Sequence, residues 1–443
     1  MDFLKNDFMT DEIKKEKDRY KSSRILYIAE AALEYFISLL VTGAYLARLT
    51  QALNISDNIT GILSAFVSLG CGFQIFAIFL ADKKPVKRWV TTIHILNQLC
   101  FCLLYVTPFF NISPIGKTTL FVAFLFCGHV LNNIVNSPKI NWFMSLVPNG
   151  RRGMFTAVKE IVSLLGGVTF IYVIGNVMDR YEAIGNTEGA FIVCGVCLTV
   201  MMILHSLTLV FSKEKIEARA EKRSAGKILK QLLSDKQLFR IILISVFWNI
   251  ARYIAVPFYG TYQIKELGFS MTFVSLLSVL YALCRSFFSV PLGRFADKYS
   301  FGKMLSVCFI VETAAFAINA FTVPTNGKVF YTVYYMLDAV GMAGINSGAI
   351  NLIYDYTEKE RRTEALALKN AFSGFAGFFT TLAISPFVKH IQNGGNKLFG
   401  LNVYAQQAVS ALACGVTIFL LVYLNTVIKK LKAEGQGKDK NLR

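Results

Sequence analysis

Ionisable side chains interrupt several long apolar stretches of this sequence, where an unpaired charge is costly. They are Glu30, Glu34, Arg252, Arg285, Glu312 and Asp338. A charge inside a membrane span generally marks a binding or ion-transfer site, and it requires a partner. A carboxyl group removed from water can also bind and release a proton near neutral pH. These residues therefore indicate the binding of a polar or charged solute, or the transfer of protons.

Three of these residues fall near the middle of their apolar stretches, namely Glu34, Arg252 and Asp338. We expect Arg252 to bind substrate or to pair with a carboxylate, and we expect Glu34 and Asp338 to carry protons. The alternative is that Arg252 and a carboxylate form a permanent ion pair with a structural role only. Glu30 lies four residues before Glu34, so the two side chains share one face of a helix.

Three further side chains belong to the same apolar stretches. Arg285 is expected to support the site from a neighbouring helix. Asn249 and Tyr35 flank the same depth as the central charges. Each of these two either contacts a ligand or packs between helices.

A second set of polar residues occurs twice in the chain, at a fixed offset of 210 positions. The motif Asn-Ser-x-x-Ile-Asn covers residues 136–141 and again 346–351. A double arginine follows each copy, and a lysine follows each double arginine; these residues are Arg151, Arg152, Lys159, Arg361, Arg362 and Lys369. A repeat over this distance indicates that the chain is a duplication of one ancestral unit.

The repeated lysines and asparagines each have two interpretations. Lys159 and Lys369 lie about seven residues past their arginine pairs, roughly 10 Å along a helix that rises 1.5 Å per residue. They either line a gate or cavity, or extend their ammonium groups back to the membrane surface. Asn136 and Asn346 either bind the hydroxyl groups of a substrate or join helices to one another.

Helices that cross a membrane must position all these residues. The chain has 443 residues, of which 54% are hydrophobic, and its mean hydropathy is +0.49. Apolar runs of about 20 residues span a bilayer, and continuous runs favour helices over a barrel. We predict an all-α integral membrane protein with twelve spans, near residues 24–48, 59–81, 89–109, 118–138, 153–177, 189–212, 238–260, 269–292, 303–324, 328–354, 364–388 and 401–428.

The basic residues predict how the chain crosses the membrane. The net charge is +18, and Lys and Arg concentrate in the termini and in the loops after even-numbered spans. Both termini are therefore expected in the cytoplasm. The charge favours contact with anionic lipid, and nucleic acid is not expected as a partner. The predicted domains are a cytoplasmic segment, a six-helix bundle, a linker containing a short amphipathic helix, a second six-helix bundle and a basic tail, at residues 1–23, 24–212, 213–236, 237–428 and 429–443.

A loop motif relates the sequence to a known family. Gly293-Arg-Phe-Ala-Asp297-Lys298 resembles the Gly-x-x-x-Asp-Arg/Lys signature of the major facilitator superfamily. Leu80-Ala81-Asp82-Lys83-Lys84 is its counterpart in the first half, where Ile78 replaces the glycine. The resemblance covers essentially the whole chain. It implies two pseudo-symmetric six-helix bundles that give a small-molecule substrate alternating access to the two sides of the membrane.

The same resemblance implies roles for individual residues. A cytoplasmic gate would consist of Asp82, Gly293, Asp297 and Lys298. The basic residues that either pair with these acids or anchor helices at the inner surface would be Arg151, Arg152, Arg361 and Arg362. Spans 1, 4, 7 and 10 would line the cavity and bring Glu34, Arg252 and Asp338 together. Glu312 would then be a structural residue on a helix outside the cavity.

Neither a cofactor nor a metal is expected. The histidines, at positions 94, 129, 205 and 390, are dispersed, and the sequence contains no phosphate-binding loop or nucleophile motif. We predict a transporter rather than an enzyme: a monomer in the plasma membrane, coupled to protons or sodium, that moves a sugar-like, organic-anion or drug-like solute. The alternatives are facilitated diffusion, a receptor or sensor that does not transport, and a membrane-embedded enzyme or scramblase.

Overall fold

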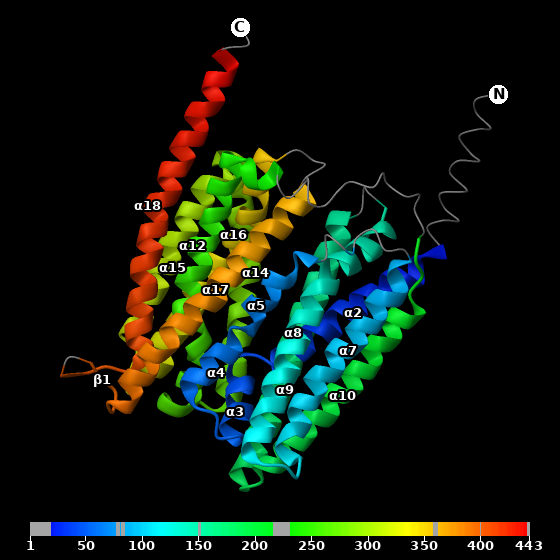
Figure 1. Ribbon diagram of the computed structural model, residues 1–443, viewed down its shortest axis with the longest axis vertical. Helices are drawn as coiled ribbons and strands as arrows, with labels where there is room; N and C mark the ends of the chain where they lie inside the picture. The colour runs from blue at the N-terminus through cyan, green and yellow to red at the C-terminus, as the bar shows by residue number, and fades with distance from the viewer. Residues whose placement is uncertain are drawn as a thin grey trace. The chain divides into compact units, whose positions relative to one another are not determined.

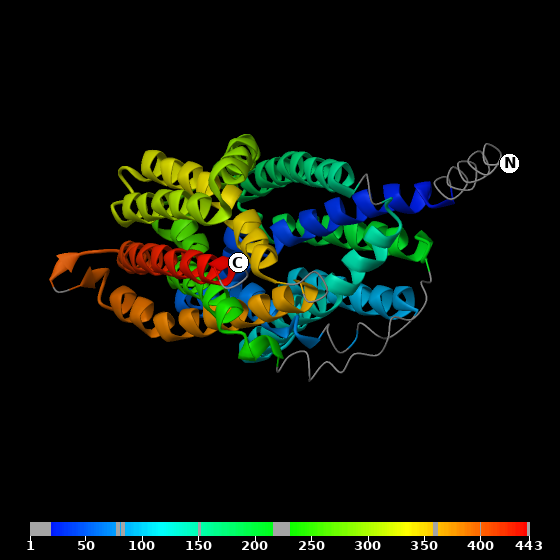
Figure 2. The same cartoon turned by 90° about the horizontal axis from the view of Figure 1, so that it is seen from above.

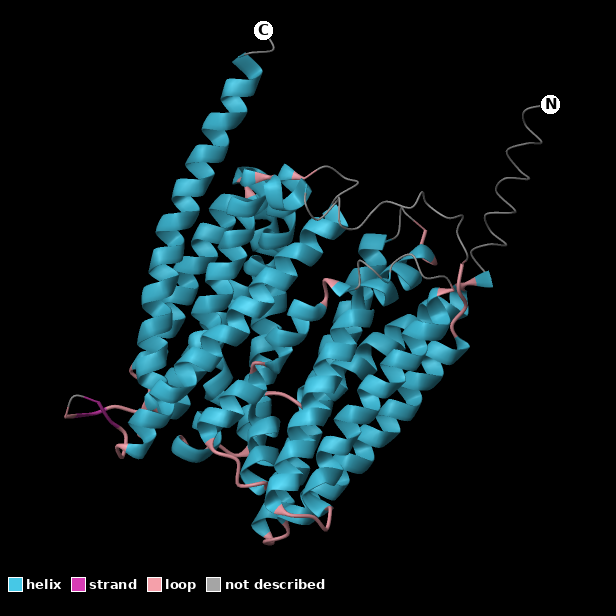
Figure 3. Cartoon of the chain, in the orientation of Figure 1, coloured by secondary structure: helices cyan, strands magenta, loops and turns pink. Residues whose placement is uncertain are grey.

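The structure, a computed structural model, describes residues 19–76, 80, 85–148, 152–215, 231–357, 362–398 and 400–440. Almost all of these residues are helical, as Figure 3 shows. A short antiparallel hairpin is formed by β1 (Lys397–Leu398) and β2 (Leu401–Asn402). The prediction of an all-α membrane protein is confirmed.

The described residues include ten helices that are long and apolar enough to cross a membrane, and one bent pair raises this to eleven. These spans correspond to all the predicted runs except the one at 59–81. That run contains two short helices, α4 (Asp57–Ser64) and α5 (Phe66–Phe73), which meet at Ala65. Residues 77–79 of the same run lie outside the described part of the chain.

Contacts divide the chain into two compact units. Unit 1 comprises Met1–Val41 and Phe79–Lys222. In this unit α2 packs against α9 and α10, while α7 packs against α8 and α10 (Figure 1). The helices of unit 1 are α2 (Lys21–Leu40), α7 (Val86–Val106), η1 (Thr107–Phe109), α8 (Pro114–Ser145), α9 (Arg152–Ala183) and α10 (Thr187–Phe211).

Unit 2 comprises Thr42–Ile78 and Arg223–Arg443. Here α15 packs against α16 and α18, and α17 packs against α4, α5 and α12. Figure 2 shows α18, in red, running beside the orange α17. Besides α4 and α5, the helices are α3 (Gly43–Ala52), α12 (Lys236–Ala255), η3 (Val256–Phe258), α13 (Tyr259–Thr261), η4 (Tyr262–Glu266), α14 (Met271–Tyr299), α15 (Phe301–Ala320), α16 (Gly327–Tyr356), α17 (Arg362–Asn393) and α18 (Ala405–Lys440).

The first predicted span is broken, which corrects the prediction of one helix over 24–48. α2 ends at Leu40, α3 begins at Gly43, and the two helices are bent by 46°. Gly43 has a φ of +56°, a left-handed conformation that glycine adopts without steric cost. The break also separates the units, because α2 belongs to unit 1 and α3 to unit 2. The division into six plus six spans stays a prediction from the repeat.

Carboxylates stabilise the starts of α7 and α12. The two carboxylate oxygens of Glu214 accept hydrogen bonds from the backbone N–H groups of Val86 (2.7 Å) and Lys87 (3.1 Å) in α7. Asp235 accepts two backbone N–H groups of α12 in the same way, at 2.9 and 3.1 Å. The first N–H groups of a helix lack partners within it, and a negative charge there also favours the helix dipole.

Replacement of Glu214 by alanine should therefore destabilise the protein. Loss of a helix cap costs about 1–2 kcal/mol, so the midpoint of thermal unfolding in detergent should fall by a few degrees. Arg88→Ala, which replaces an exposed residue of α7, is the control. Equal midpoints for the two variants would show that the cap does not contribute.

Candidate functional site

Arg252 and Asp338 form an ion pair in unit 2. Arg252 lies in the last turn of α12 and Asp338 on α16, and Arg252 Nη1 donates to Asp338 Oδ1 over 2.6 Å. The arginine side chain is 20% exposed and the aspartate side chain 6%. A guanidinium group that binds a carboxylate makes a strong, directional interaction. Asp338 is thus buried, whereas Arg252 is partly accessible.

A second carboxyl group, that of Glu312 on α15, lies beside this pair. It is fully buried, and it interacts electrostatically with both Asp338 and Arg252. Gly341 of α16 makes room for it, because a Cβ there would lie 2.4 Å from Glu312 Oε1. Glu312, expected as a structural residue on a helix outside the cavity, thus lies beside the Arg252–Asp338 pair, and the glycine lets α15 and α16 approach closely at this point.

Aromatic side chains surround the charged group of unit 2. The guanidinium carbon of Arg252 lies 5.9 Å from the centre of the Trp248 ring. Gln263 of η4 donates from its amide to the hydroxyl groups of Tyr331 (2.9 Å) and Tyr335 (3.0 Å). The tyrosines whose hydroxyl groups interact electrostatically with Asp338 are Tyr259, Tyr281, Tyr334 and Tyr335. The environment of the charged group combines ring faces with hydroxyl, amide and charged groups. Tyr281 and Tyr335 are half-buried, whereas the other rings and Gln263 are buried.

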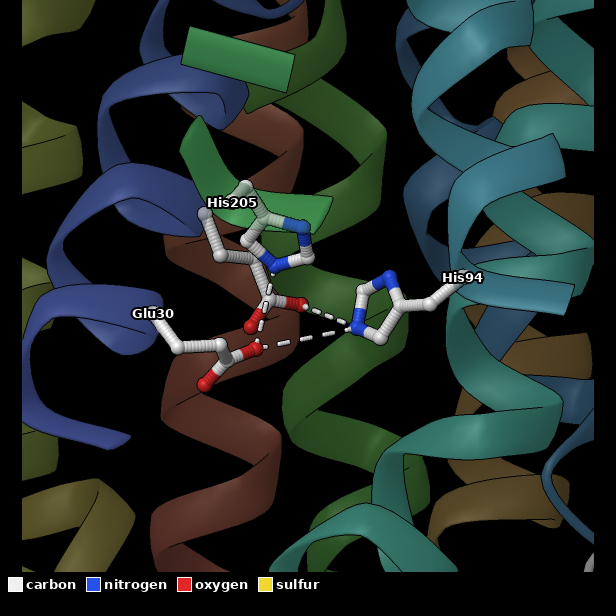
Figure 4. A group of neighbouring side chains, drawn as sticks. Glu30, His94 and His205 are labelled. Carbon is white, nitrogen blue, oxygen red and sulfur yellow. Dashed lines mark hydrogen bonds and ion pairs between the residues drawn. The ribbon is translucent and has the colours of Figure 1, made fainter. Parts of the chain in front are cut away.

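Unit 1 contains a separate charged cluster that joins α2, α7, α8 and α10. Lys139 Nζ donates to Glu30 Oε1 (2.8 Å), to Glu34 Oε2 and to His94 Nε2 (2.9 Å). His205 Nε2 donates to Glu30 Oε1 over 3.1 Å. Figure 4 shows that the side chains of Glu30, His94 and His205 point toward one another. All the members are buried except Glu34, whose side chain is 23% exposed.

This cluster corrects two expectations. His94 and His205 are not dispersed, because their ring centres lie 4.8 Å apart. Lys139 is not a loop residue after a span that ends at 138, because α8 continues to Ser145 and buries it. The repeat contained the missing signal: Lys139 corresponds to Ala349, which lies well inside an apolar stretch. Pro138, next to Lys139, hid the continuation of the helix, since proline usually ends one.

Glu34, predicted to converge with Arg252 and Asp338, belongs to a different unit from those two residues. Its partner in the structure is Lys139 of unit 1, whereas Arg252 and Asp338 belong to unit 2. Tyr35, on the same helix as Glu34, packs against α9, where a Cβ at Gly167 would lie 2.4 Å from its ring. Its position favours the packing interpretation.

The predicted asparagines differ in exposure. Asn249 donates its amide to the carbonyl of Ser245 over 3.0 Å, within its own helix. Asn136 on α8 is half-buried, and Asn346 on α16 is exposed. None of these placements joins an asparagine to the charged groups through a hydrogen bond among the described residues.

The remaining predicted cations lie near aromatic or polar groups. Lys159 Nζ stands 5.3 Å from the centre of the Tyr27 ring in unit 1. Lys369 of α17 interacts electrostatically with Cys71 of α5. Arg285 of α14 interacts with Tyr281, one turn earlier, and so lies next to the charged group of unit 2.

Comparison with known proteins identifies the fold. A family model described as Major Facilitator Superfamily matches residues 28–270 and again residues 241–442. The chain belongs to the major facilitator superfamily. No curated protein sequence matches it significantly. As a member of this superfamily it is a multi-pass membrane transporter and not an enzyme.

Solved structures of superfamily members resemble the chain over almost its whole length. The nucleoside transporter NupG has a TM-score of 0.66 and 14% identity, covering 93% of this chain and 99% of its own. A D-xylose–proton symporter has a TM-score of 0.61 and 15% identity, covering 90% and 97%. The inward-open xylose transporter XylE from E. coli has a TM-score of 0.66 and 13% identity, covering 92% and 99%. Identities this low establish the shared fold alone.

The residues predicted to form a cytoplasmic gate are only partly described. Gly293, Asp297 and Lys298 lie in the last turns of α14 and are exposed, so residues 295–299 are helical and not the predicted loop. Lys298 Nζ lies 5.3 Å from the centre of the Tyr299 ring. Asp82, Arg151 and Arg361 lie outside the described residues, as does the side chain of Arg152, which begins α9.

Arg362, predicted either to pair with the gate acids or to anchor a helix, contacts the end of α16. Its guanidinium group donates to the carbonyl oxygens of Tyr354 (2.8 Å) and Thr357 (3.3 Å) and covers the Tyr354 ring at 4.8 Å. These carbonyls belong to the C-terminal end of α16, where cations are favoured by the helix dipole. Arg362 therefore fastens the start of α17 to the end of α16 within unit 2.

Proposed function

We propose that the chain is a proton-coupled secondary transporter of a small hydroxylated ring compound, such as a sugar or a nucleoside. The observation that carries the proposal is the group formed by Arg252, Asp338 and Glu312 among tyrosines. A superfamily transporter that buries two carboxyl groups beside one guanidinium group combines a polar binding surface with an exchangeable proton.

The substrate class follows from the chemistry of the surrounding side chains. Tyr281 and Tyr335 are half-buried, so their rings can stack on a substrate and their hydroxyl groups can form hydrogen bonds with ribose or hexose hydroxyl groups. Arg252 has an accessible side and can donate to a carbonyl or hydroxyl oxygen. The similarity of the fold to transporters described for nucleosides and xylose is consistent with this class.

Proton coupling is assigned to Glu312 together with Asp338. One guanidinium charge faces two carboxyl groups, so a single proton on the pair balances the charge. The titratable groups that interact electrostatically with Glu312 are Asp338 of α16, Arg252 of α12, Tyr281 of α14 and Cys308 of α15. Substrate that engages Arg252 weakens the Arg252–Asp338 pair, and Asp338 then competes for the proton.

The test is transport by purified protein in liposomes with an imposed pH gradient. A panel of labelled sugars, nucleosides, organic anions and cationic drugs is offered, in the presence and absence of sodium. We expect one of the first two classes to accumulate against its gradient when the pH gradient is present, without a requirement for sodium. Equal uptake with and without the pH gradient contradicts proton coupling.

The Glu312→Gln variant distinguishes proton coupling from movement of the substrate across the membrane. The amide cannot exchange the proton, so accumulation driven by the pH gradient should fall at least about tenfold, as general acid–base groups contribute on this scale or more. Exchange of labelled for unlabelled substrate should persist, because it does not require net proton movement. Glu266→Gln, on η4, is the matched control. Loss of exchange as well would assign Glu312 a structural role.

The same liposomes distinguish a transporter from a receptor that only binds, because a receptor would bind the solute without exchanging it. We further propose a monomer in the plasma membrane that contacts anionic lipid and has both termini in the cytoplasm. The distribution of basic residues supports this orientation. Cysteine labelling from each side of intact cells, with single cysteines near each terminus, tests it.

A further inference from the structure

The cluster of unit 1 has the composition and geometry of a metal-binding site. Two carboxylates and two imidazoles, from Glu30, Glu34, His94 and His205, have ligand atoms that all lie within 4.8 Å of one another. Glu30 Oε1 lies 3.9 Å from His94 Nε2 and 3.1 Å from His205 Nε2, and Glu34 Oε1 lies 3.7 Å from His94 Nε2. Ligand atoms of a tetrahedral Zn²⁺ site are separated by about 3.4 Å, given bonds near 2.1 Å.

The Lys139 ammonium group occupies the position of the cation. Its three N–H bonds point to Glu30, Glu34 and His94, three of the four potential ligands. Because the ammonium group donates to His94, the Nε2 atom of His94 is unprotonated, as metal ligation requires. The side-chain atoms that would bind a metal ion thus already bind a positively charged ammonium group.

The charges of the cluster are not balanced by Lys139 alone. Two carboxylates and one ammonium group leave one negative charge when both imidazoles are neutral. Glu30 Oε2 is buried and has no hydrogen-bond partner among the described residues. A divalent cation that replaced the ammonium group would balance the two carboxylates completely.

We propose that Glu30, Glu34, His94 and His205 form a binding site for a divalent transition-metal ion, with Lys139 as an internal cation that competes for it. Two nitrogen and two oxygen ligands suit borderline ions such as Zn²⁺ and Co²⁺, whereas Mg²⁺ and Ca²⁺ prefer oxygen alone. On binding, His205 shifts its proton from Nε2 to Nδ1, which has no partner among the described residues. The proposal is independent of the proposed substrate.

Two features of unit 1 allow the exchange. Pro138 lies inside α8, immediately before Lys139, and a proline removes a helical hydrogen bond and permits bending. The segment that carries Lys139 can therefore move away from α2 without unfolding of the helix. Glu34 is the partly exposed member of the cluster, so its carboxylate gives an incoming ion a first ligand at the surface of the unit.

Metal binding by the purified full-length protein tests the proposal, after removal of any histidine tag. Co²⁺ is the probe, because a tetrahedral site gives it a strong visible absorption, and Zn²⁺ competition measures affinity. The double histidine variant described below measures background binding by the nine cysteines and the other two histidines. We expect one equivalent of Co²⁺ per chain in the wild-type protein. Lys139→Met should bind it at least about tenfold more tightly, because a competing like charge is removed.

The controls separate the site from adventitious binding. Lys117→Met, a change near the start of the same helix, should retain wild-type affinity, and His94→Gln with His205→Gln should lose the absorption. If Lys139→Met does not fold, the comparison of wild-type protein with the double histidine variant still decides. Absence of tetrahedral Co²⁺ in wild-type and Lys139→Met proteins overturns the proposal, and so does binding that survives loss of both histidines.

Discussion

Replacement of Lys139 by alanine, in the presence of a metal chelator, is expected to destabilise the protein by about 3–5 kcal/mol, the cost of leaving a buried charge without its partner. The residue is buried, and its ammonium group contacts Glu30, Glu34 and His94. Its loss leaves two carboxylates close together on α2. The midpoint of thermal unfolding in detergent, followed by tryptophan fluorescence, should fall by many degrees.

A neutral version of the cluster provides the decisive control. Glu30→Gln, Glu34→Gln and Lys139→Met together remove all the charges and should recover much of the lost stability, because no unpaired charge is then buried. Lys117→Ala, near the start of the same helix, should leave the midpoint unchanged. If Lys139→Ala unfolds at the wild-type temperature, the cluster contributes no net stability to unit 1.

Replacement of Arg252 by methionine should abolish transport. A hydrogen bond that involves a charged group contributes about 1.5–3 kcal/mol, which corresponds to a loss of roughly 10- to 150-fold in binding. The same change leaves Asp338 and Glu312 next to each other without a cation, so net proton-driven uptake should also disappear. The measurement is counterflow of whichever solute the transport panel identifies, and Lys236→Met at the start of the same helix is the control.

Two further variants distinguish substrate binding from maintenance of the fold. Arg252→Lys keeps the charge but loses the planar group that matches a carboxylate, so it should retain stability and lose most of the transport. Arg252→Met combined with Asp338→Asn should unfold at a higher temperature than Arg252→Met alone. Counterflow at the wild-type rate in Arg252→Met removes this residue from the substrate site.

The architecture was predictable because hydrocarbon permits few backbone conformations. Apolar runs of about 20 residues had to be helices, and the repeat at 136–141 and 346–351 indicated a duplicated bundle. The break between α2 and α3 was not predictable, because residues 24–48 read as one apolar run. It depends on the left-handed conformation of Gly43, and a glycine within an apolar run does not by itself reveal its φ angle.

The sequence predicted that the candidate sites contain charged residues, but it identified only some of those residues. Arg252 and Asp338 could be identified because an unpaired charge inside an apolar stretch costs free energy. The contact of Glu312 with this pair was not predictable, because it depends on the close approach of α15 and α16 at Gly341. The two histidines of the charged cluster, His94 and His205, are separated by 111 positions in sequence, and no local spacing could have shown that α7 and α10 bring them together.

The broken first span also determines how the chain could be divided. Residues 42–78 pack within unit 2, although the chain on both sides of them packs within unit 1. A protease that cuts the linker between α10 and α12 would therefore not produce two fragments that each contain one complete unit. The N-terminal fragment would still carry α3, α4 and α5, which pack against η3, α13, η4 and α17 of the other fragment. Two half-genes divided at the linker should consequently yield polypeptides that assemble with each other, whereas the C-terminal half expressed alone would lack α3, α4 and α5 of its unit.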